Sequence, residues 1–340
     1  MIDSEQLKQN VVKAVEEIRA TNPMAGSITN TVTIDFVANA QLAVGGSAAM
    51  VYLPDEGEAL VAGGGAIYLN MGTLFPIYEQ TIPRAAKAAH DAGKPWVLDP
   101  VGLGIGSLRT QLVNELKQYK PAIVRGNASE IIALAGLWGL EGEAADLSRV
   151  RGVDTTDTVD AARAAAVALA RYTGGAVVVS GEVDLITDGM TVAKSHGGSP
   201  LMSKITGCGC SQGGVLAVYA CAADPFTAAV AACSINSGAY VAEIFRAGIQ
   251  SISIGQSRAA LSLGMTPRQT MRYVVLPQAF KRVIPPLGNE FIAMLKDSSL
   301  VSVIGFEELT RKGQLIIADT YGSVEIWSTV AILYLAMTFT

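Results

Sequence analysis

Short apolar runs alternate with helical patterns from residue 27 to about residue 223. The apolar runs are GAIYLN, PWVLD, AIVRG and GAVVVSG, at residues 65–70, 95–99, 122–126 and 175–181. Helix-like stretches lie between and around them, at residues 76–92, 108–118, 128–136 and 157–173. Near-continuous apolar runs are typical of parallel strands that are buried on both faces. The alternation therefore predicts an α/β fold, with a mostly parallel central sheet and helices on both of its faces.

Polar side chains end or follow these apolar runs, at the edge where parallel sheets bind ligands. They are Asn70, Asp99, Arg125, Asn127 and Ser180. Because the carboxyl ends of parallel strands meet at one edge of a sheet, we expect these side chains to converge on one crevice. A second interpretation stays open for each of them, since such residues also cap helices and close turns.

The composition bounds the class of protein. The chain has 340 residues, a net charge of −5 and no run rich in Lys and Arg, which argues against a nucleic-acid partner. The first 20 residues form an acidic amphipathic helical pattern and not a secretion signal. Four cysteines, at positions 208, 210, 221 and 233, give no spaced disulfide framework. We therefore expect a reducing, cytoplasmic location for the first two thirds of the chain.

The stretch SKITGCGCSQGG, residues 203–214, places two cysteines one residue apart among glycines. A zinc site would need more cysteines or histidines at the usual spacings, and a disulfide across C-x-C would be strained. The glycines favour a turn that feeds a helix, whose free N–H groups and dipole bind anions such as phosphate. A cysteine in the first turn of such a helix is expected to have a depressed pKa. The alternative is a turn of small residues that allows tight helix packing.

Six motifs in this part of the chain resemble those of the hydroxyethylthiazole kinase family, a member of the ribokinase-like superfamily. They are SITNTVTIDFVAN, LNMGT, VLDPVG, RGNASE, GEVDLITDG and TGCGC. The resemblance covers residue 1 to about residue 232. It implies a ribokinase-like fold and the ATP- and Mg²⁺-dependent phosphorylation of the primary alcohol of 4-methyl-5-(2-hydroxyethyl)thiazole, in thiamine salvage. It also implies a homotrimer with the site between subunits.

The resemblance assigns roles in the nucleotide and metal site to residues that match the motifs. Arg125 and Ser180 would contact ATP, with Ser180 at a position where the family usually has Thr. Asn127 and Glu130 form the N-x-x-E motif that would hold Mg²⁺ and the phosphate waters, and Asp99 would lie beside the same metal. Carboxylates and water are the ligands that Mg²⁺ prefers, and phosphoryl transfer depends mainly on positioning and charge neutralisation.

The thiazole end of the site is assigned in the same way. Met50 and Gly207 would contact the thiazole, and Asn30 would lie near it. Cys210 occupies the position of the catalytic base in ribokinase-like enzymes, where Asp is common. Two roles stay open for it, a thiolate base or a small residue that shapes the anion hole. Cys208 is expected to take no part.

The character of the sequence changes after about residue 232. The region from about residue 236 to residue 340, which includes SGAYVAEIF, resembles the C-terminal part of a polar amino-acid ABC transporter permease. The signature of that family, E-A-A followed by Gly and then Leu-Pro, corresponds to Arg258-Ala259-Ala260, Gly264 and Leu276-Pro277, with Arg258 in place of Glu. The last apolar run, EIWSTVAILYLAMTFT, is shorter than the ~20 residues of a spanning helix.

Two domains are therefore predicted, a kinase-like domain at residues 1–232 and a partial permease-like helical segment at residues 233–340. In the permease family the signature loop docks on an ATPase subunit, so residues 255–277 would be the contact with an ABC ATPase. A membrane association through the tail stays open. Two other interpretations also remain, an amino-acid ABC transporter permease fragment and a non-functional chimeric reading frame.

Overall fold

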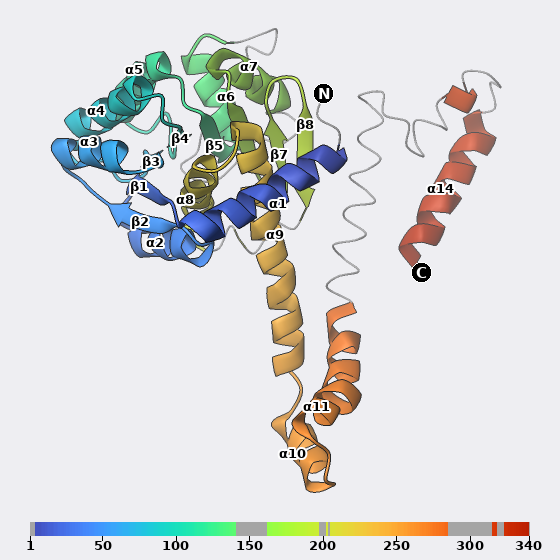
Figure 1. Ribbon diagram of the computed structural model, residues 1–340. Coiled ribbons are helices and arrows are strands. Elements are labelled where there is room, and N and C mark those ends of the chain that lie inside the picture. Colours follow the sequence, from blue (N-terminus) through green and yellow to red (C-terminus); the bar gives the residue numbers. More distant parts are fainter. Residues whose placement is uncertain are drawn as a thin grey trace. The chain divides into compact units, whose positions relative to one another are not determined.

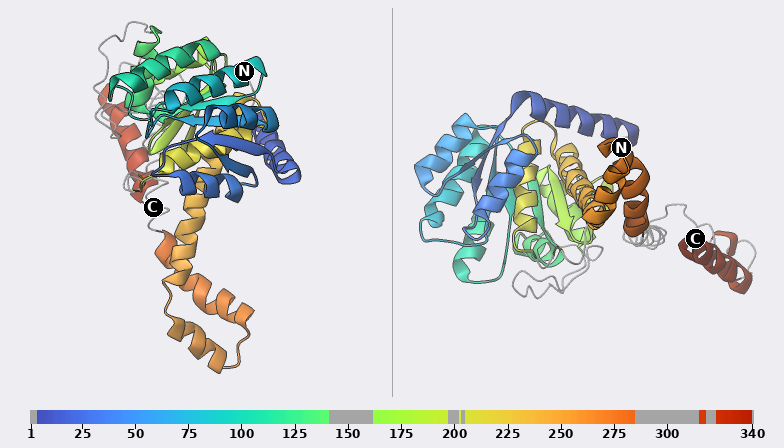
Figure 2. Two further views of the ribbon diagram at one scale, coloured as in Figure 1. Left: turned by 90° about the vertical axis from the view of Figure 1, so that its left-hand side faces the viewer. Right: turned by 90° about the horizontal axis from the view of Figure 1, so that it is seen from below.

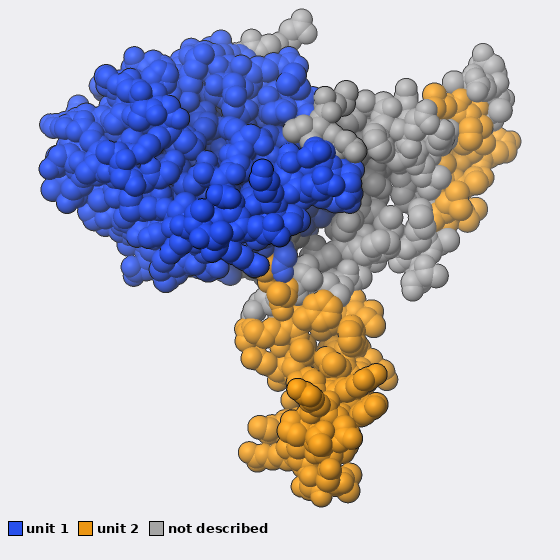
Figure 3. Space-filling model, in the orientation of Figure 1, with its two compact units in different colours: residues 1–238 blue, residues 239–340 orange. Residues whose placement is uncertain are grey.

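The computed structural model describes residues 4–140, 162–196, 202, 205–284, 315–317 and 323–339. The chain divides into two compact units, residues 1–238 and residues 239–340 (Figure 3). The first unit contains the sheet and most of the helices. The second unit is helical where it is described. The assignment of residues 1–232 and 233–340 to two functional domains stays a prediction.

The described residues of unit 1 form one eight-stranded sheet in the order β2-β1-β3-β4-β5-β6-β7-β8. The strands are β1 (Met24–Ile28), β2 (Ser47–Met50), β3 (Ala66–Asn70), β4 (Trp96–Asp99), β5 (Ile123–Asn127), β6 (Ala176–Ser180), β7 (Val183–Thr187) and β8 (Val192–His196). The strands from β2 to β6 pair in parallel, and β7 and β8 complete the sheet as an antiparallel pair. The prediction of a mostly parallel sheet is therefore confirmed.

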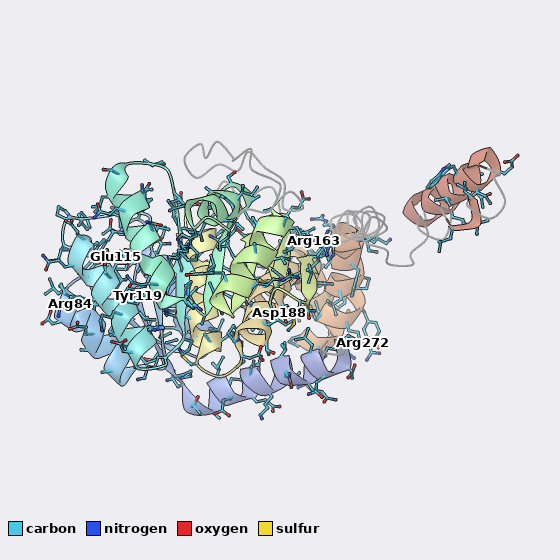
Figure 4. The ribbon with its side chains drawn as sticks, turned by 90° about the horizontal axis from the view of Figure 1, so that it is seen from above. Arg84, Glu115, Tyr119, Arg163, Asp188 and Arg272 are labelled. Atoms are coloured by element: carbon cyan, nitrogen blue, oxygen red, sulfur yellow. The ribbon has the colours of Figure 1, made fainter. Side chains whose placement is uncertain are left out.

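Helices cover both faces of this sheet (Figures 1 and 2). On one face lie α1 (Ser4–Thr21), α2 (Ile34–Ala43), α8 (Cys208–Ala220) and the first half of α9 (Pro225–Gln250). On the other face lie α3 (Pro54–Gly63), α4 (Tyr78–Asp91), α5 (Ser107–Leu116), α6 (Ala128–Leu137) and α7 (Arg163–Thr173). On the outer surface, Arg84 of α4 pairs with Glu58 of α3 at 2.6 Å (Figure 4).

Alternate residues of each central strand enter different cores. In β3, Ala66 and Tyr68 belong to the core under α8, whereas Ile67 and Leu69 belong to the core under α4. The same alternation places Val97 under α8 and Leu98 on the opposite face. Because side chains on a strand alternate with a period of two, the residue two positions later on each strand also faces α8. This periodicity decides which side chains reach the helix that begins with Cys208.

The four strands expected from the sequence are confirmed within one residue of their ends, and four more strands were missed. The missed strands are β1, β2, β7 and β8. The sequences MAGSI, SAAM and VAKSH mix small and polar residues with few large apolar ones, so their periodicity is weak. The expected helices at 76–92, 108–118 and 128–136 correspond to α4, α5 and α6. For the helix at 157–173, α7 covers 163–173, and residues 157–161 lie outside the described part.

Unit 2 is helical where it is described, as the sequence indicates. After α9 come α10 (Ile254–Ser262), α11 (Pro267–Thr270), a π-helical stretch (Met271–Val275) and α14 (Ser323–Phe339). Gly264, with φ +85°, ends the α10 segment in a left-handed turn. Among the described residues, no helix is long and apolar enough to cross a membrane.

Candidate active site

The carboxyl ends of β3, β4, β5 and β6 bring four of the expected polar side chains into one buried network. Asn70 and Asp99 are register partners, and so are Asn127 and Ser180. The Asn70 side chain donates to Asp99 Oδ2 at 3.1 Å, and Arg125 reaches both Asp99 and Ser180. The expected convergence is therefore observed for Asn70, Asp99, Arg125 and Ser180.

The carboxyl group of Asp99 lies at the centre of the network and is fully buried. Its Oδ2 accepts hydrogen bonds from the Tyr68 hydroxyl at 2.7 Å and from Asn70, and it lies 3.5 Å from Arg125 Nη1. Its Oδ1 is buried without a hydrogen-bond partner among the described residues. Burial raises the pKa of Asp99, and the Arg125 guanidinium opposes that shift. A buried carboxylate oxygen without a hydrogen-bond donor is suited to bind a cation.

Arg125 supplies a cation that is fixed from three sides. Its Nη2 donates to Ser180 Oγ at 2.7 Å, its Nη1 faces Asp99 and its Nε donates to Gln212 Oε1 at 3.3 Å. Burial opposes the charge on Arg125, but the nearby carboxylates Asp99 and Glu130 outweigh burial and raise its pKa. The guanidinium is therefore charged at any physiological pH.

The two glycines of the TGCGC stretch are each required for a different structural reason. Gly207 precedes the first residue of α8 with φ +97°, a conformation that favours glycine. Gly209 lies so close to Arg125 that an added Cβ would be 2.4 Å from Nη2. The N–H groups of Gly209 and Cys210 have no hydrogen-bond partner in the part of the chain that the structure describes. Free N–H groups at a helix N-terminus beside a guanidinium form an anion-binding arrangement.

Cys210 lies between the two asparagines of the site. Its Sγ accepts from Asn30 Nδ2 at 3.3 Å and from Asn70 Nδ2 at 3.4 Å. The expectation of a depressed pKa is wrong: burial and the charge of Asp99 raise the pKa of the Cys210 thiol. The helix N-terminus favours the thiolate, but a nearby negative charge and low solvent access act against it more strongly. All four cysteines are free.

Glu130 and Asn127 form a capping box at the start of α6. The Asn127 side chain accepts from Glu130 N at 2.9 Å, and Glu130 Oε2 accepts from Asn127 N at 2.9 Å. Glu130 Oε1 accepts from Gly102 N at 3.1 Å. Burial, with the charge of Asp99, raises the pKa of Glu130 to about 7. The capping interpretation of Asn127 is therefore correct, and the same motif places a second carboxyl group near Asp99.

These carboxyl groups fit a magnesium ion that keeps most of its water. Mg²⁺ is usually bound by one or two protein carboxylates together with water and substrate phosphates. The unpartnered Oδ1 of Asp99 is one such ligand. The charge of Asp99 raises the pKa of Glu130, and a cation beside both carboxyl groups would lower it. Among the described residues, no cluster of three or more His, Cys, Asp or Glu side chains forms a protein-only metal cage.

Two of the three residues assigned to the thiazole end, Asn30 and Gly207, lie at the start of α8. Asn30 is buried, donates to Asn70 Oδ1 at 3.0 Å and accepts from Thr33 Oγ1 at 3.0 Å. An added Cβ at Gly207 would be 2.8 Å from the Phe36 ring, so the start of α8 contacts α2. Met50 ends the edge strand β2, where it is half-buried against the core under α8.

Three residues of this network were missed from the sequence. They are Tyr68, Asp184 and Gln212. Tyr68 lies two positions before Asn70 on β3, so the period of two places both on the face toward α8. Asp184 is the one charged residue of the strand VDLIT, and Gln212 is a buried amide on the otherwise small and apolar helix α8. A polar residue inside an apolar element was the signal that could have identified them.

The profile of the hydroxyethylthiazole kinase family matches residues 15–251, more than half of the chain. The chain belongs to the hydroxyethylthiazole kinase family. A hydroxyethylthiazole kinase of Bifidobacterium longum subsp. infantis is 46% identical over 255 residues, which cover 70% of this chain and 81% of the relative. One from Leptospira interrogans is 39% identical over 228 residues and covers 67% of this chain. The structure of a hydroxyethylthiazole kinase from Pyrococcus horikoshii superposes with a TM-score of 0.57 at 25% identity, covering 81% of this chain and 92% of that one.

A second profile, the binding-protein-dependent transport system inner membrane component, matches residues 214–340. It covers less than half of the chain and overlaps the kinase-family match between residues 214 and 251. The overlap contains residues 214–220 of α8 and all of α9. The tail is therefore similar to a transport-component family over a limited region.

Proposed function

We propose that the chain transfers the γ-phosphoryl group of ATP to the primary alcohol of 4-methyl-5-(2-hydroxyethyl)thiazole, as in thiamine salvage. The observation that carries this proposal is the Arg125 guanidinium held against the Gly209 backbone at the N-terminus of α8. This arrangement lies at the carboxyl edge of a kinase-type parallel sheet, in a chain of the hydroxyethylthiazole kinase family.

The arrangement suits the demands of phosphoryl transfer. In a loose transition state, negative charge is spread over the oxygens of the transferred group, so fixed positive groups stabilise it most. Arg125 supplies a guanidinium that is positioned before substrate binds, and the N–H groups of Gly209 and Cys210 can donate to the same oxygens. In this proposal Ser180, which is bonded to Arg125, and Asn127, at the start of α6, line the nucleotide side.

The alcohol would approach from the side of Asn30, Met50 and Gly207. Its attacking oxygen loses a proton late in the reaction, and the sulfur of Cys210 is the acceptor that we assign. Because the raised pKa keeps the resting side chain as a thiol, the base form is a minority that grows with pH. Asn30 and Asn70, which both donate to this sulfur, hold it in place and stabilise the thiolate when it forms.

Asp99 and Glu130 would hold Mg²⁺ at the phosphate end. Bound there, the ion would neutralise charge on the phosphate oxygens. Asp99 Oδ1 is the direct ligand that we assign, and Glu130 would act through water because both of its oxygens already accept backbone N–H groups. Arg125 balances the charge of Asp99 whether or not the ion is present.

A test of this function is ADP release by the purified full-length chain with and without the thiazole alcohol, in Mg²⁺ and in excess EDTA. We expect ADP release that requires both the alcohol and Mg²⁺. A matched control replaces the alcohol with its 5-ethyl analogue, which lacks the hydroxyl group. Equal ADP release with the alcohol and with the analogue would mean that the chain hydrolyses ATP without transferring phosphate to this substrate.

The exposed apolar side chains beside the site support a homotrimer of unit 1. Val32, Phe36 and Leu53 are 71%, 44% and 47% exposed; Phe36 lies against Gly207 at the start of α8, and Leu53 follows the edge strand β2 by three residues. In this proposal a second copy of the chain covers them and completes the thiazole side. Light scattering coupled to size-exclusion chromatography tests it, with a trimer mass expected and a stable monomer mass against it.

We further propose that the tail is a partial segment of a polar amino-acid ABC permease that takes no part in the chemistry. The match over residues 214–340 supports it, and so do the placements of Ala260 and Gly264, of which Ala260 is buried and Gly264 ends α10. A membrane or ABC ATPase contact through residues 255–277 belongs to this proposal. Flotation of the full-length chain with phospholipid vesicles tests the membrane part, with co-flotation expected and a chain left in the dense fraction against it.

A further inference from the structure

A buried amide links the proposed phosphate-binding cation to a carboxylate that faces the core. Gln212 on α8 is 5% exposed, and its Oε1 accepts from Arg125 Nε at 3.3 Å. Its Nε2 donates to Asp184 Oδ2 at 2.9 Å and lies 3.5 Å from the sulfur of Cys233. Asp184 is 8% exposed, and its Oδ1 accepts from Gly181 N at 3.0 Å. The chain Asp184–Gln212–Arg125 thus joins β7, α8 and β5.

The chemistry of these partners fixes how the amide points. A guanidinium can only donate hydrogen bonds, and an ionised carboxylate can only accept them. An amide placed between the two must therefore direct its oxygen to Arg125 and its nitrogen to Asp184. A reversed amide would place donor against donor at one end and acceptor against acceptor at the other, and such buried mismatches are costly. Asp184 therefore sets the orientation of Gln212, although it does not contact Arg125.

The same carboxylate also holds the turn that follows β6. Gly181, whose N–H donates to Asp184, is the residue after Ser180, and Ser180 is bonded to Arg125 Nη2 at 2.7 Å. Asp184 thus supports Arg125 from two sides, through Gln212 at Nε and through the Gly181 turn at Nη2. A guanidinium held at three nitrogens has little freedom to follow a misplaced phosphate.

We propose that Gln212 and Asp184 are positioning residues that aim the Arg125 guanidinium at the phosphate groups of ATP. This inference rests on the proposed function, in which Arg125 binds ATP. The two residues act on nucleotide binding through Arg125. At the thiazole end, Asn30 and Cys210 are bonded to each other and to Asn70, and among the described residues neither is bonded to Gln212 or Asp184.

The test is a double-mutant cycle on the full-length chain, read out as the Kd of ATP by calorimetry and as the KM of each substrate. In D184N, the amide oxygen of the new residue can accept from only one of the two donors that Asp184 binds, Gln212 Nε2 and Gly181 N, and its NH₂ then clashes with the other. In Q212E, two carboxyl groups face each other. We expect each single variant to weaken ATP binding about tenfold, which is the loss of one buried hydrogen bond, and to leave the KM of the thiazole alcohol unchanged.

The double variant D184N/Q212E tests whether the hydrogen bonds themselves, and not only the presence of buried side chains at 184 and 212, support ATP binding. Its side chain at 184 can donate to the carboxylate at 212, which can accept from Arg125 Nε, so every hydrogen bond is restored with the same net charge. We expect its Kd for ATP to return to within about twofold of the wild-type value. The proposal is overturned if the Kd for ATP of the double variant rises by the product of the two single-variant factors. It is also overturned if the single variants leave the Kd for ATP unchanged. If D184N does not fold, Q212M and the double variant carry the same test.

Gln41 provides a matched control on the opposite side of α8. It is fully buried, its Nε2 donates to Gly214 O at 3.3 Å and to Ser27 Oγ at 3.1 Å, and it has no contact with Arg125. Q41M should lower the melting temperature without a selective rise in ATP Kd. If the wild-type chain binds ATP but does not phosphorylate the alcohol, the proposed function is wrong, and the ATP Kd values of the variants still test the positioning role. A wild-type chain that does not bind ATP overturns both.

Discussion

The two units of this chain bury their apolar residues to very different extents. In unit 1, both faces of the sheet are covered, and large side chains such as Trp96, Trp138 and Tyr219 are almost fully buried. In the described part of unit 2, the buried cluster consists of Ile252, Val275 and Ala279 with Ile249 packed against it. The large apolar side chains exposed there include Ile254 at 66%, Leu263 at 85% and Tyr273 at 63%.

The two units also differ in charge. Residues 239–340 carry nine Lys or Arg and seven Asp or Glu side chains, a net charge of +2, whereas residues 1–238 carry 16 Lys or Arg and 23 Asp or Glu side chains, a net charge of −7. A domain that folds alone hides most of its apolar surface in its own core, and exposed apolar patches mark surfaces that meet a partner. The comparison teaches that unit 1 buries its large apolar side chains in its own cores, whereas the described part of unit 2 leaves several of them exposed.

The largest effect should come from the central cation of unit 1. R125K keeps the charge but cannot hold Asp99, Ser180 and Gln212 at once, so the phosphate groups lose a fixed donor. We expect turnover to fall by about a thousandfold, the upper range for losing one such donor. The matched variant in unit 2 is R272K, at an arginine beside the Tyr273 ring (Figure 4). Steady-state ADP release measures the turnover of both variants. Equal losses of turnover in R125K and R272K would contradict the assignment of the chemistry to unit 1.

A smaller loss is expected for the sulfur at the start of α8. C210S should lower turnover by about a hundredfold, the low end for a general base, and leave the Kd of ATP nearly unchanged. Because the pKa of Cys210 is raised, wild-type turnover should increase with pH above neutrality, and the serine variant should lose that increase. Cys208, two residues earlier, is the control, and C208S should behave as wild type. Unchanged turnover in C210S would rule out the base role.

The Mg²⁺ dependence should change with pH. Glu130 has a pKa of about 7, so it is mostly protonated at pH 6 and mostly ionised at pH 8. Its ionised form attracts the metal, and we expect the apparent Mg²⁺ affinity to rise roughly tenfold over this range. E130Q should weaken the affinity at pH 8 and flatten the pH dependence. A Mg²⁺ titration of ADP release at the two pH values measures this, and an identical titration for E130Q would exclude the role of Glu130 at the metal.

The fold of unit 1 could be predicted from the sequence where strands are long and apolar, because burial on both faces leaves a plain signal. The edge strand β2, with the sequence SAAM, could not, since half-buried small residues carry little periodicity. In the site, Asp99, Arg125 and Ser180 were found because they end apolar runs. Gln212 and Asp184 were missed because their partners come from other elements, and only the packed structure brings them together.

The direction of the pKa shift of Cys210 shows a second limit of prediction from the sequence. The helix N-terminus can be recognised in the sequence, and it predicts a lowered pKa. The proximity of Asp99 and the depth of burial depend on how α8 packs against β3 and β4, and they reverse the shift. Electrostatic effects of neighbours that are distant in sequence are therefore the part that sequence reasoning misses.

The most direct test compares the full-length chain with a chain that ends at residue 251, where the kinase-family match ends, one residue after α9. The mass of the phosphorylated thiazole alcohol and its rate of formation are measured for both. If unit 1 holds the whole chemistry, both chains form the product, with kcat values within about twofold of each other. Product from the full-length chain alone would place an essential part of the enzyme in the tail, and product from neither would contradict the assignment of kinase activity to this chain.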